Sequence, residues 1–510
     1  MSVARTLLAG SITRVTQTVI SMLVAFFMMP FLVGELGDHW YGVWTVIGSL
    51  AAAYHLFDMG MAGAITRYVS YALGQNDDHD ANRVINTSLS VYVGIALVLT
   101  LVSALAAWLA PQFLSEGTEN VEIIQWVMLI VGVSVALEFP FNALAGVASA
   151  KLRFHQVALA RIVTTLLGAG FTVYAVKQGY GIVGIAVVSF LTARLSNLMY
   201  FLICRSAFPE LRFGRKWFSG SKLKELFGYS FWAFIIAIAY QMRNNVDNFV
   251  VAGALSAAMV THYYIGARLV EFLGMMLSQA TNMFVPIFTQ YFSRDDQSEL
   301  REKLIFVTRI NFFIALICAG GLTILGDAFI RSWMGDGYRD AYWVMVILLI
   351  GRMIGFANHP LNSALYAANR HHIIAKIDVI EVIVNLVLSL ILVQYLGLIG
   401  VALGTMIPLV FFRIIFLPLY GCRAIGISML DYYRSFVRPA LVVMPLLIAF
   451  YALMQWTSTP NSLPLILIVG MLGGGLIAAL GVRASFPVHE RKMLGKLIPL
   501  PGLRRLFIGV

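Results

Sequence analysis

The chain has 510 residues, of which 60% are hydrophobic and 12% are charged, and its mean hydropathy is +0.83. A composition this apolar excludes a soluble globular domain and indicates an integral membrane protein. The net charge of +11 is explained by basic loops beside anionic lipid, so it gives no reason to expect a nucleic-acid partner.

Fourteen apolar segments follow one another along the chain, separated by glycine, proline and charged residues. Each is long enough to cross a hydrocarbon core of about 30 Å as a helix. We therefore expect an all-α integral membrane protein with helices over 11–33, 39–64, 85–110, 121–148, 155–177, 181–204, 226–253, 258–290, 303–326, 340–367, 372–395, 398–421, 437–456 and 462–484.

Lysine and arginine are distributed unevenly between the two sides that these helices define. The N-terminus, every second loop and the tail hold most of the 36 basic residues, with a dense cluster in 205–225. The opposite loops hold Lys177, Arg331 and Arg339. Because basic loops stay in the cytoplasm, we expect both termini to be cytoplasmic.

The two halves of the chain share short motifs. Pro140-Phe-Asn142 corresponds to Pro360-Leu-Asn362, and GIVGIA from Gly181 corresponds to GLIGVA from Gly397. Because each half has an even number of helices, the copies share one orientation. We expect two six-helix lobes in parallel repeat around a central cavity, comprising an N-lobe (1–204), a cytoplasmic linker (205–225), a C-lobe (226–422), two extra helices (423–484) and a basic cytoplasmic tail (485–510).

Two of the expected helices carry polar faces that cannot point at lipid. In 226–253, the stretch QMRNNVDNF places Arg243, Asn244, Asp247 and Asn248 on one side. In 258–290, a narrow stripe contains Tyr264, Arg268, Glu271 and Gln279. Because an arginine at the bilayer midplane costs about 2.5 to 3.5 kcal/mol, we expect these side chains to face protein or a wet cavity.

Further ionisable residues lie at or near membrane depth. Arg352 has no acidic partner within a turn of its helix, which favours a functional role, whereas Arg194, Asp378 and Glu381 lie near cytoplasmic ends and are expected to be structural. Arg14 is either a snorkelling topology marker or a gate residue. The spacings of Arg243 with Asp247 and of Arg268 with Glu271 also fit structural ion pairs.

A cavity that contains several arginines suits an anionic substrate, because a guanidinium binds phosphate through a fixed fork. The carboxylates either pair with the arginines when substrate is absent or bind a proton or Na+ that couples transport to a gradient. The sequence has no GxxxxGK[ST], HExxH or GxSxG motif, and its three cysteines form no CxxC pair. We therefore expect neither an enzyme nor a metal site, and no cofactor apart from that coupling ion.

The segment LFDMGMAGAITRY, from Leu56 to Tyr68, leads into GQNDD and resembles the FD-x-G…R-x-V hallmark of bacterial polysaccharide translocases. The repeated P-x-N and G-x-x-G-x-A motifs and the six-plus-six-plus-two layout are also similar. The chain is identified as a member of the O-antigen and exopolysaccharide flippases, the polysaccharide transporter branch of the multidrug/oligosaccharidyl-lipid/polysaccharide exporter superfamily. The resemblance covers essentially its full length.

The resemblance implies that the chain moves a polyprenyl-diphosphate-linked oligosaccharide from the cytoplasmic to the periplasmic leaflet of the bacterial inner membrane by alternating access. It implies membrane lipids as partners, and a polysaccharide polymerase and chain-length proteins as possible ones. Arg243, Arg268 and Arg352 would contact the diphosphate or an acidic sugar, with Asn244, Asn248, Tyr264 and Gln279 as further substrate contacts. Coupling or gating would fall to Asp58, Asp247, Glu271 and Arg14.

Three rival interpretations remain open. A multidrug and toxin extrusion antiporter shares the twelve-helix core but favours cationic drugs, which the arginines disfavour. A lipid II flippase also has fourteen helices, although the FDMG segment is not expected of it. A non-transporting scaffold for polysaccharide synthesis would leave the charges within the membrane without a purpose.

Overall fold

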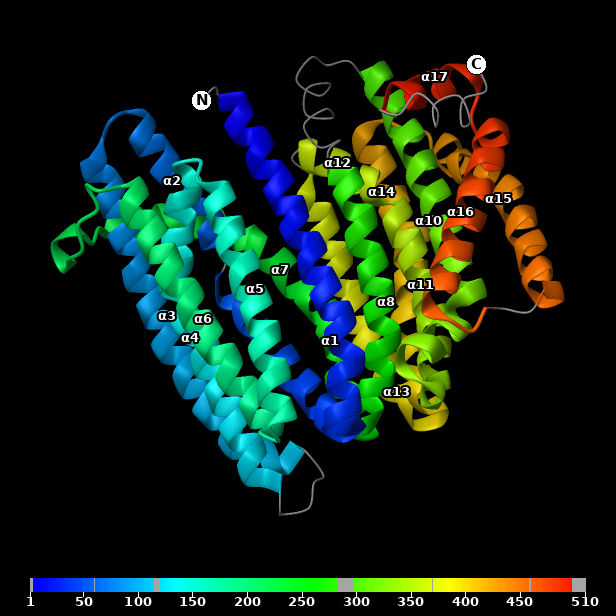
Figure 1. The fold of residues 1–510 in the computed structure, drawn as a ribbon. Coiled ribbons are helices and arrows are strands. Elements are labelled where there is room, and N and C mark those ends of the chain that lie inside the picture. Colours follow the sequence, from blue (N-terminus) through cyan, green and yellow to red (C-terminus); the bar gives the residue numbers. More distant parts are fainter. Residues whose placement is uncertain are drawn as a thin grey trace. The chain divides into compact units, whose positions relative to one another are not determined.

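The computed structural model describes residues 3–58, 60–113, 120–282, 297–368, 370–457 and 460–497. Every regular element within these ranges is a helix (Figure 1). Ten of the described segments are long and apolar enough to cross a membrane. This confirms the expected all-α, multi-pass membrane fold.

The ten segments account for twelve of the fourteen expected helices, because two segments each contain a pair. In the first pair, α1 (Val3–Tyr54) bends at Gly37, where φ is 77°. In the second, α13 (His371–Phe411) bends at Gly397, where φ is 57°. The other two expected helices are α7 (Gly220–Ala254) and α8 (Ala257–Asn282), which carry the polar faces and are not among the ten.

Three expected helices are interrupted in the structure. The α-helix expected over 39–64 ends at Tyr54 and is followed by a 3-10 turn, η1 (His55–Asp58), and by a second helix, α2 (Met61–Gly74). Gly60 separates the two, because its left-handed φ of 75° ends the helical path. The helix expected over 340–367 divides at Asn358 into α11 (Arg339–Ala357) and α12 (His359–Ala367), since Pro360 has no N–H with which to continue the ladder. The helix expected over 398–421 contains a π-helical turn, η5 (Phe412–Phe416), and then α14 (Leu417–Ile425).

The chain forms two compact units, residues 1–261 and 262–510, called here the N-terminal and C-terminal units. In the N-terminal unit, α4 (Val121–Ala150) packs against α3 (Asp78–Phe113) and α6 (Gly181–Ala207), and α5 (Phe154–Lys177) packs against α6 and α1 (Figure 1). Helix α7 packs against α1, α2 and α3 of the same unit. The core between α2, α3 and α4 includes Ile65, Tyr92 and Phe139, all fully buried.

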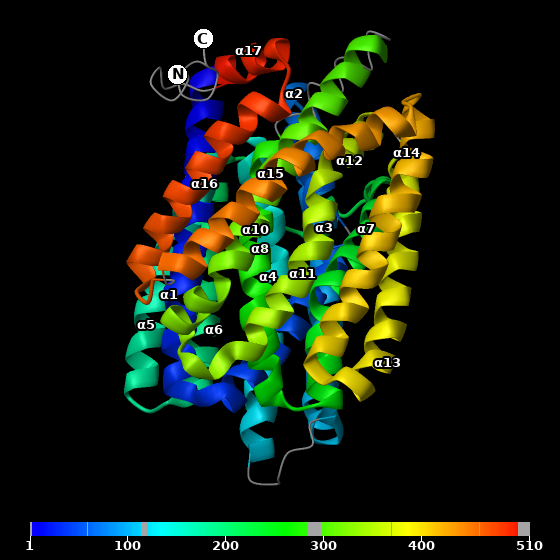
Figure 2. The same ribbon diagram turned by 90° about the vertical axis from the view of Figure 1, so that its right-hand side faces the viewer.

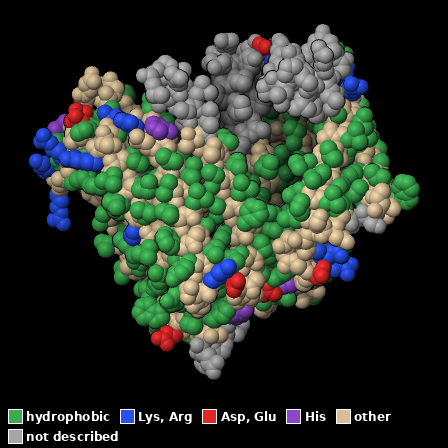
Figure 3. All heavy atoms as spheres, in the orientation of Figure 1, with side chains coloured by type: hydrophobic (Ala, Val, Ile, Leu, Met, Phe, Trp, Pro, Cys, Tyr) green, Lys and Arg blue, Asp and Glu red, His purple; other side chains and the backbone are tan. Residues whose placement is uncertain are grey.

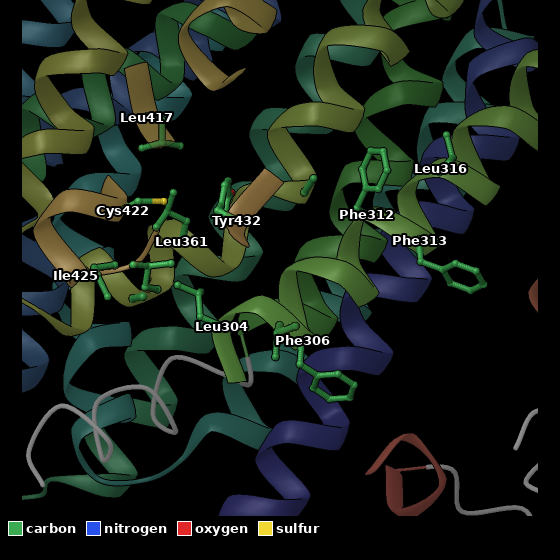
Figure 4. Packing of buried hydrophobic residues seen from close by; sticks show 14 of the residues in the cluster. Leu304, Phe306, Phe312, Phe313, Leu316, Leu361, Leu417, Cys422, Ile425 and Tyr432 are labelled. Carbon is green, nitrogen blue, oxygen red and sulfur yellow. The ribbon is translucent and has the colours of Figure 1, made fainter. Parts of the chain in front are cut away.

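The C-terminal unit contains α10 (Gln297–Met334), α15 (Met429–Thr457), α16 (Leu463–Ser485) and α17 (Val488–Leu497) besides α11 to α14 (Figure 2). Its core joins α10, α12, α14 and α15 through Phe312, Leu361, Cys422 and Tyr432 (Figure 4). Helix α8 lies close against α11, because a Cβ added at Gly266 would meet the main chain of α11. Helix α17, inside the region expected as a basic tail, packs on α10 and was not predicted as a helix.

The repeated glycine motif has the same structural role in both units. Gly181 and Gly397 adopt left-handed φ values of 52° and 57° and reverse the chain between two helices. The second glycine of each motif allows those helices to touch. A Cβ at Gly184, on α6, would lie 3.2 Å from the Cβ of Ala175 on α5, and one at Gly400 would lie 2.9 Å from the main-chain nitrogen of Val393 in the other arm of α13. The sequence repeat is therefore a repeated helical hairpin.

The surface agrees with a lipid environment. Hydrophobic side chains cover most of the face in Figure 3. Large apolar residues such as Leu101 on α3, Leu441 on α15 and Leu472 on α16 are exposed, which would be costly in water and is favourable against acyl chains.

Candidate functional site

The polar face of α7 lies deep within its helix and is partly buried in the N-terminal unit. Arg243 is half-buried and lies three turns, about 16 Å, before the end of α7 at Ala254. Asp247 and Asn248 are buried, whereas Asn244 is exposed. The Nδ2 of Asn248 donates to Ser49 Oγ at 2.8 Å, which fastens this face to α1. Of the residues expected on the polar face, Asp247 and Asn248 thus point into the interior of the unit.

Asp58 connects three elements at the break between α1 and α2. Its Oδ1 accepts a 2.5 Å hydrogen bond from the Tyr92 hydroxyl on α3, and its Oδ2 accepts one from the Ala62 N–H at 3.4 Å. Gly60 supplies the left-handed residue that this turn needs. The aspartate of the FDMG stretch therefore holds a bend, where sequence reasoning expected a continuous helix.

Arg14 lies on the surface of the N-terminal unit. Its guanidinium lies 4.6 Å from the centre of the Phe154 ring, at the start of α5. This geometry is a cation–π contact at an exposed position.

The stripe on α8 contains an ion pair and two aromatic contacts. Arg268 Nη1 donates to Glu271 Oε2 at 2.5 Å, so the i,i+3 pair that the spacing allowed is formed. The guanidinium also lies 4.7 Å from the ring centre of Phe272 and 5.9 Å from that of Tyr264. Arg268 is about 16 Å from Ala257 and about 21 Å from Asn282, too far from either end of the described helix for its side chain to snorkel out.

The remaining predicted residues divide between the same two units. Arg352 is half-buried on α11 in the C-terminal unit, where Tyr264, Arg268 and Glu271 also lie. The side chain of Gln279 falls outside the described residues. The predicted substrate contacts on α7 thus lie in one unit, and those on α8 and α11 lie in the other.

The structure contains a buried ionic cluster whose cation sequence reasoning did not single out. Arg413 Nη2 lies 2.5 Å from Asp378 Oδ1 and 3.1 Å from Glu381 Oε2, and all three residues are buried. Arg413 belongs to the π-helical turn η5, a distortion that often occurs at functional sites. The signal that could have found it is the i,i+3 spacing of two carboxylates in one arm of the glycine hairpin, which calls for a cation in the other arm.

Two neutral side chains hold the π-helical turn in place. Asn358 Nδ2 donates to the main-chain oxygen of Arg413 at 3.2 Å, and the Tyr432 hydroxyl donates to Asn358 Oδ1 at 2.5 Å. Asp378 and Glu381, expected to be structural, therefore belong to a network that joins α13, η5, α15 and the junction of α11 with α12. Among the described residues, no group of three His, Cys, Asp or Glu side chains is arranged to hold a metal ion.

Comparisons with known proteins agree with this architecture. A sequence model of a family described as polysaccharide biosynthesis proteins matches residues 40–342. The chain is 24% identical over 457 residues to the uncharacterized membrane protein EpsK of Bacillus subtilis (strain 168), and the match covers 87% of each chain. It is 22% identical to a putative O-antigen transporter of Shigella flexneri, over 78% of this chain and 94% of the relative.

Among solved structures, the fold resembles the inward closed conformation of the lipid II flippase MurJ. The TM-score is 0.68 with 15% sequence identity, and the match covers 92% of this chain and 99% of that structure. At this identity the likeness concerns the fold alone.

Proposed function

The chain belongs to the family of polysaccharide biosynthesis proteins, and we propose from this premise that it is a flippase for a lipid-linked glycan. Its substrate would be a polyprenyl-diphosphate-linked oligosaccharide, moved from the cytoplasmic to the periplasmic leaflet of a bacterial inner membrane. The multi-pass fold and the transporter relative from Shigella flexneri support this proposal. Both termini would lie in the cytoplasm, because the basic loops alternate with poorly charged ones.

The observation that carries the proposal is the placement of guanidinium groups far from helix ends. Arg243 and Arg268 each lie about 16 Å or more from the end of the described helix, where a charge is expensive unless protein or substrate groups compensate it. A diphosphate offers such groups charge and paired oxygens. In this proposal Arg243, Arg268 and Arg352 bind the diphosphate, and Asn244, Asn248, Tyr264 and Gln279 bind the sugars.

The ion pair on α8 gives this site an exchange mechanism. Arg268 is held by Glu271 at 2.5 Å, and an arriving diphosphate would compete for the same guanidinium. A carboxylate released in this way can take up a proton or Na+, which would link substrate binding to an ion gradient. Glu271 and Asp247 would serve in this coupling, and Asp58 and Arg14 would control the movements that expose the site to each leaflet in turn.

The test replaces the arginines in a strain that lacks the native gene. We expect Arg243→Gln and Arg268→Gln to abolish surface polysaccharide and to trap lipid-linked oligosaccharide in the cytoplasmic leaflet, while the protein still reaches the membrane. Arg331→Gln is the matched control, because Arg331 also pairs with a carboxylate on its own helix, at 2.6 Å from Asp327, but near the helix end. Normal polysaccharide in both site variants would remove these arginines from the mechanism.

A further inference from the structure

The connection between α6 and α7 is held in place by side chains of α3. We call residues 208–219 the strap. Two asparagines of α3 bind its main chain in succession: Asn82 donates to Glu210 O at 3.2 Å and accepts from Arg212 N at 2.7 Å. Asn86, one turn later, donates to Arg212 O at 2.8 Å and accepts from Gly214 N at 3.0 Å. Each asparagine amide thus donates to one main-chain oxygen of the strap and accepts from one of its N–H groups, so these backbone groups are satisfied without a regular secondary structure.

Further contacts secure both ends of the strap. Phe208 and Leu211 are buried in the core of the N-terminal unit, and the Ser219 N–H donates to Thr87 Oγ1 at 3.0 Å. The Trp217 ring meets the ring of His79 edge-on, with centroids 4.7 Å apart. A loop that served only as a positive-inside signal would need basic residues, but it would not need buried asparagines that bind its backbone.

The fixed backbone presents a basic and aromatic surface. The segment LRFGRKWF, from Leu211 to Phe218, contains three cations and no acidic residue. Arg212, Arg215 and Lys216 are exposed, and Phe213 and Phe218 are 51% and 48% exposed. In Figures 1 and 3, which share one orientation, the strap is the green segment at the left edge, and lysine and arginine side chains gather there.

The strap lies beside the end of a helix that is expected to span the membrane. The ring of Phe213 stacks on the ring of Phe201, with centroids 6.3 Å apart. Phe201 lies six residues, about 9 Å, before the end of α6 at Ala207, within an expected membrane helix. The strap's other supports, Asn82 and Asn86, belong to the first turns of α3. Exposed phenylalanine is unfavourable in water, whereas aromatic and basic side chains together suit the membrane interface.

We propose that the strap is a binding element for the anionic lipid surface of the cytoplasmic leaflet, with Phe213 and Phe218 among the upper acyl chains and Arg212, Arg215 and Lys216 on lipid phosphates. The α3 asparagines act as positioning residues, because they hold the backbone so that these side chains face outward. The proposal is independent of the transported substrate.

The test places the photo-crosslinking residue benzoylphenylalanine at position 218 of the full-length protein, which keeps an aromatic ring there. The protein is reconstituted in phosphatidylcholine vesicles with or without phosphatidylglycerol, and lipid adducts are counted by mass spectrometry. We expect more adducts when phosphatidylglycerol is present. Replacing Arg212, Arg215 and Lys216 by Gln should lower lipid occupancy by roughly 100-fold, at about fivefold for each cation. Replacing Lys177, Arg331 and Arg339 by Gln removes the same charge elsewhere and should leave the yield unchanged.

A second variant tests the role of the asparagines. Asn86→Asp can still accept from Gly214 N but cannot donate to Arg212 O, so it should reduce adducts while all three cations remain. Equal yields in the two vesicle types, or an unchanged yield in the triple Gln variant, would overturn the proposal. Adducts with a protein instead of lipid in native membranes would overturn it in favour of a protein partner. Normal surface polysaccharide in a strain that lacks the gene, together with persistent lipid adducts of the reconstituted protein, would refute the proposed function and leave the lipid-binding strap intact.

Discussion

The glycine hairpin of the N-terminal unit, α5 with α6, and that of the C-terminal unit, the two arms of α13 continuing into η5, share a turn but differ in what they bury. Gly181 and Gly397 have nearly equal φ values. Yet the C-terminal hairpin buries Asp378, Glu381 and Arg413, while the residues 216 positions earlier in the sequence are Ile162, Thr165 and Asn197.

The repeat therefore preserves a backbone geometry, while the buried polar groups of the two hairpins have diverged. In the N-terminal hairpin, Asn197 Nδ2 reaches the Leu137 main-chain oxygen at 3.5 Å, a weak neutral contact to α4. The ionic cluster in the other hairpin must instead offset the desolvation of three charged groups. Substitutions at corresponding positions should therefore have very different effects in the two units.

The largest effect is expected for Arg413→Met, which leaves two carboxylates buried without their cation. Breaking a buried ion pair in this way costs about 3 to 5 kcal/mol. We expect a marked loss of protein that stays monodisperse after heating in detergent, whereas Asn197→Ala should lose about 1 kcal/mol or less. Adding Asp378→Asn and Glu381→Gln to Arg413→Met should recover much of the loss. Equal losses in Arg413→Met and Asn197→Ala would show that the two hairpins do not differ as described.

A smaller loss is expected for Arg309→Gln in the C-terminal unit. Arg309 Nη1 lies 2.6 Å from both oxygens of Glu490 and joins α17 to α10, and both side chains are largely shielded from solvent. Hydrogen bonds between charged groups contribute about 1.5 to 3 kcal/mol. Limited proteolysis should release the C-terminal segment faster in this variant, and an unchanged cleavage rate would show that the pair does not hold α17.

A loss of stability is also expected when the second glycine of each hairpin motif is replaced by alanine. Gly400→Ala would press a methyl group against the main chain of Leu392 and Val393, which cannot rotate away, at a cost of about 1 to 3 kcal/mol. Gly184→Ala would meet the Cβ atoms of Tyr180 and Ala175 at 2.7 and 3.2 Å, which are less severe overlaps than the closer approach of Gly400→Ala to the main-chain oxygen of Leu392. Melting temperatures should therefore fall more for Gly400→Ala, and the reverse order would contradict this account of the two turns.

The smallest effect is expected for Lys222→Gln, which removes an ion pair from the N-terminal unit as Arg309→Gln does from the C-terminal unit. Lys222 Nζ lies 2.9 Å from Asp80 and 3.3 Å from Glu225 beside the strap, partly in solvent, so its loss should cost at most about 1 kcal/mol. Burial lowers the pKa of Lys222, but its bonds to Asp80 and Glu225 raise it further, above the usual value. A raised pKa means that the stabilisation is fully present below the unfolded-state pKa and is lost as pH rises through the folded-state value. The stability difference from the native protein should thus be constant across neutral pH and vanish only in strong alkali.

Sequence reasoning correctly predicted the all-α membrane fold, the repeated glycine hairpin and the family, because a membrane requires long apolar segments and a left-handed turn favours glycine. Of the helix expected over 258–290, residues 283–290 lie outside the described residues. The helix assigned to 39–64 was wrong at residues 55–58 and 60, where the left-handed Gly60 ends the helical path and the distant Tyr92 hydroxyl binds Asp58. The candidate transport residues on α7, α8 and α11 stay predictions, tested by the substitutions above.

The sequence alone was enough to find the segments that are long and apolar enough to cross a membrane, the alternation of basic and poorly charged loops, and the charges within apolar segments. These properties follow from local composition and from periodicity along one helix. Tertiary structure alone decided that Arg413 would pair with Asp378 and Glu381, and that Asn82 and Asn86 would hold the strap. Those partners lie tens of residues apart or more, and a buried polar group is satisfied by whatever donor or acceptor the packing of helices brings within about 3 Å.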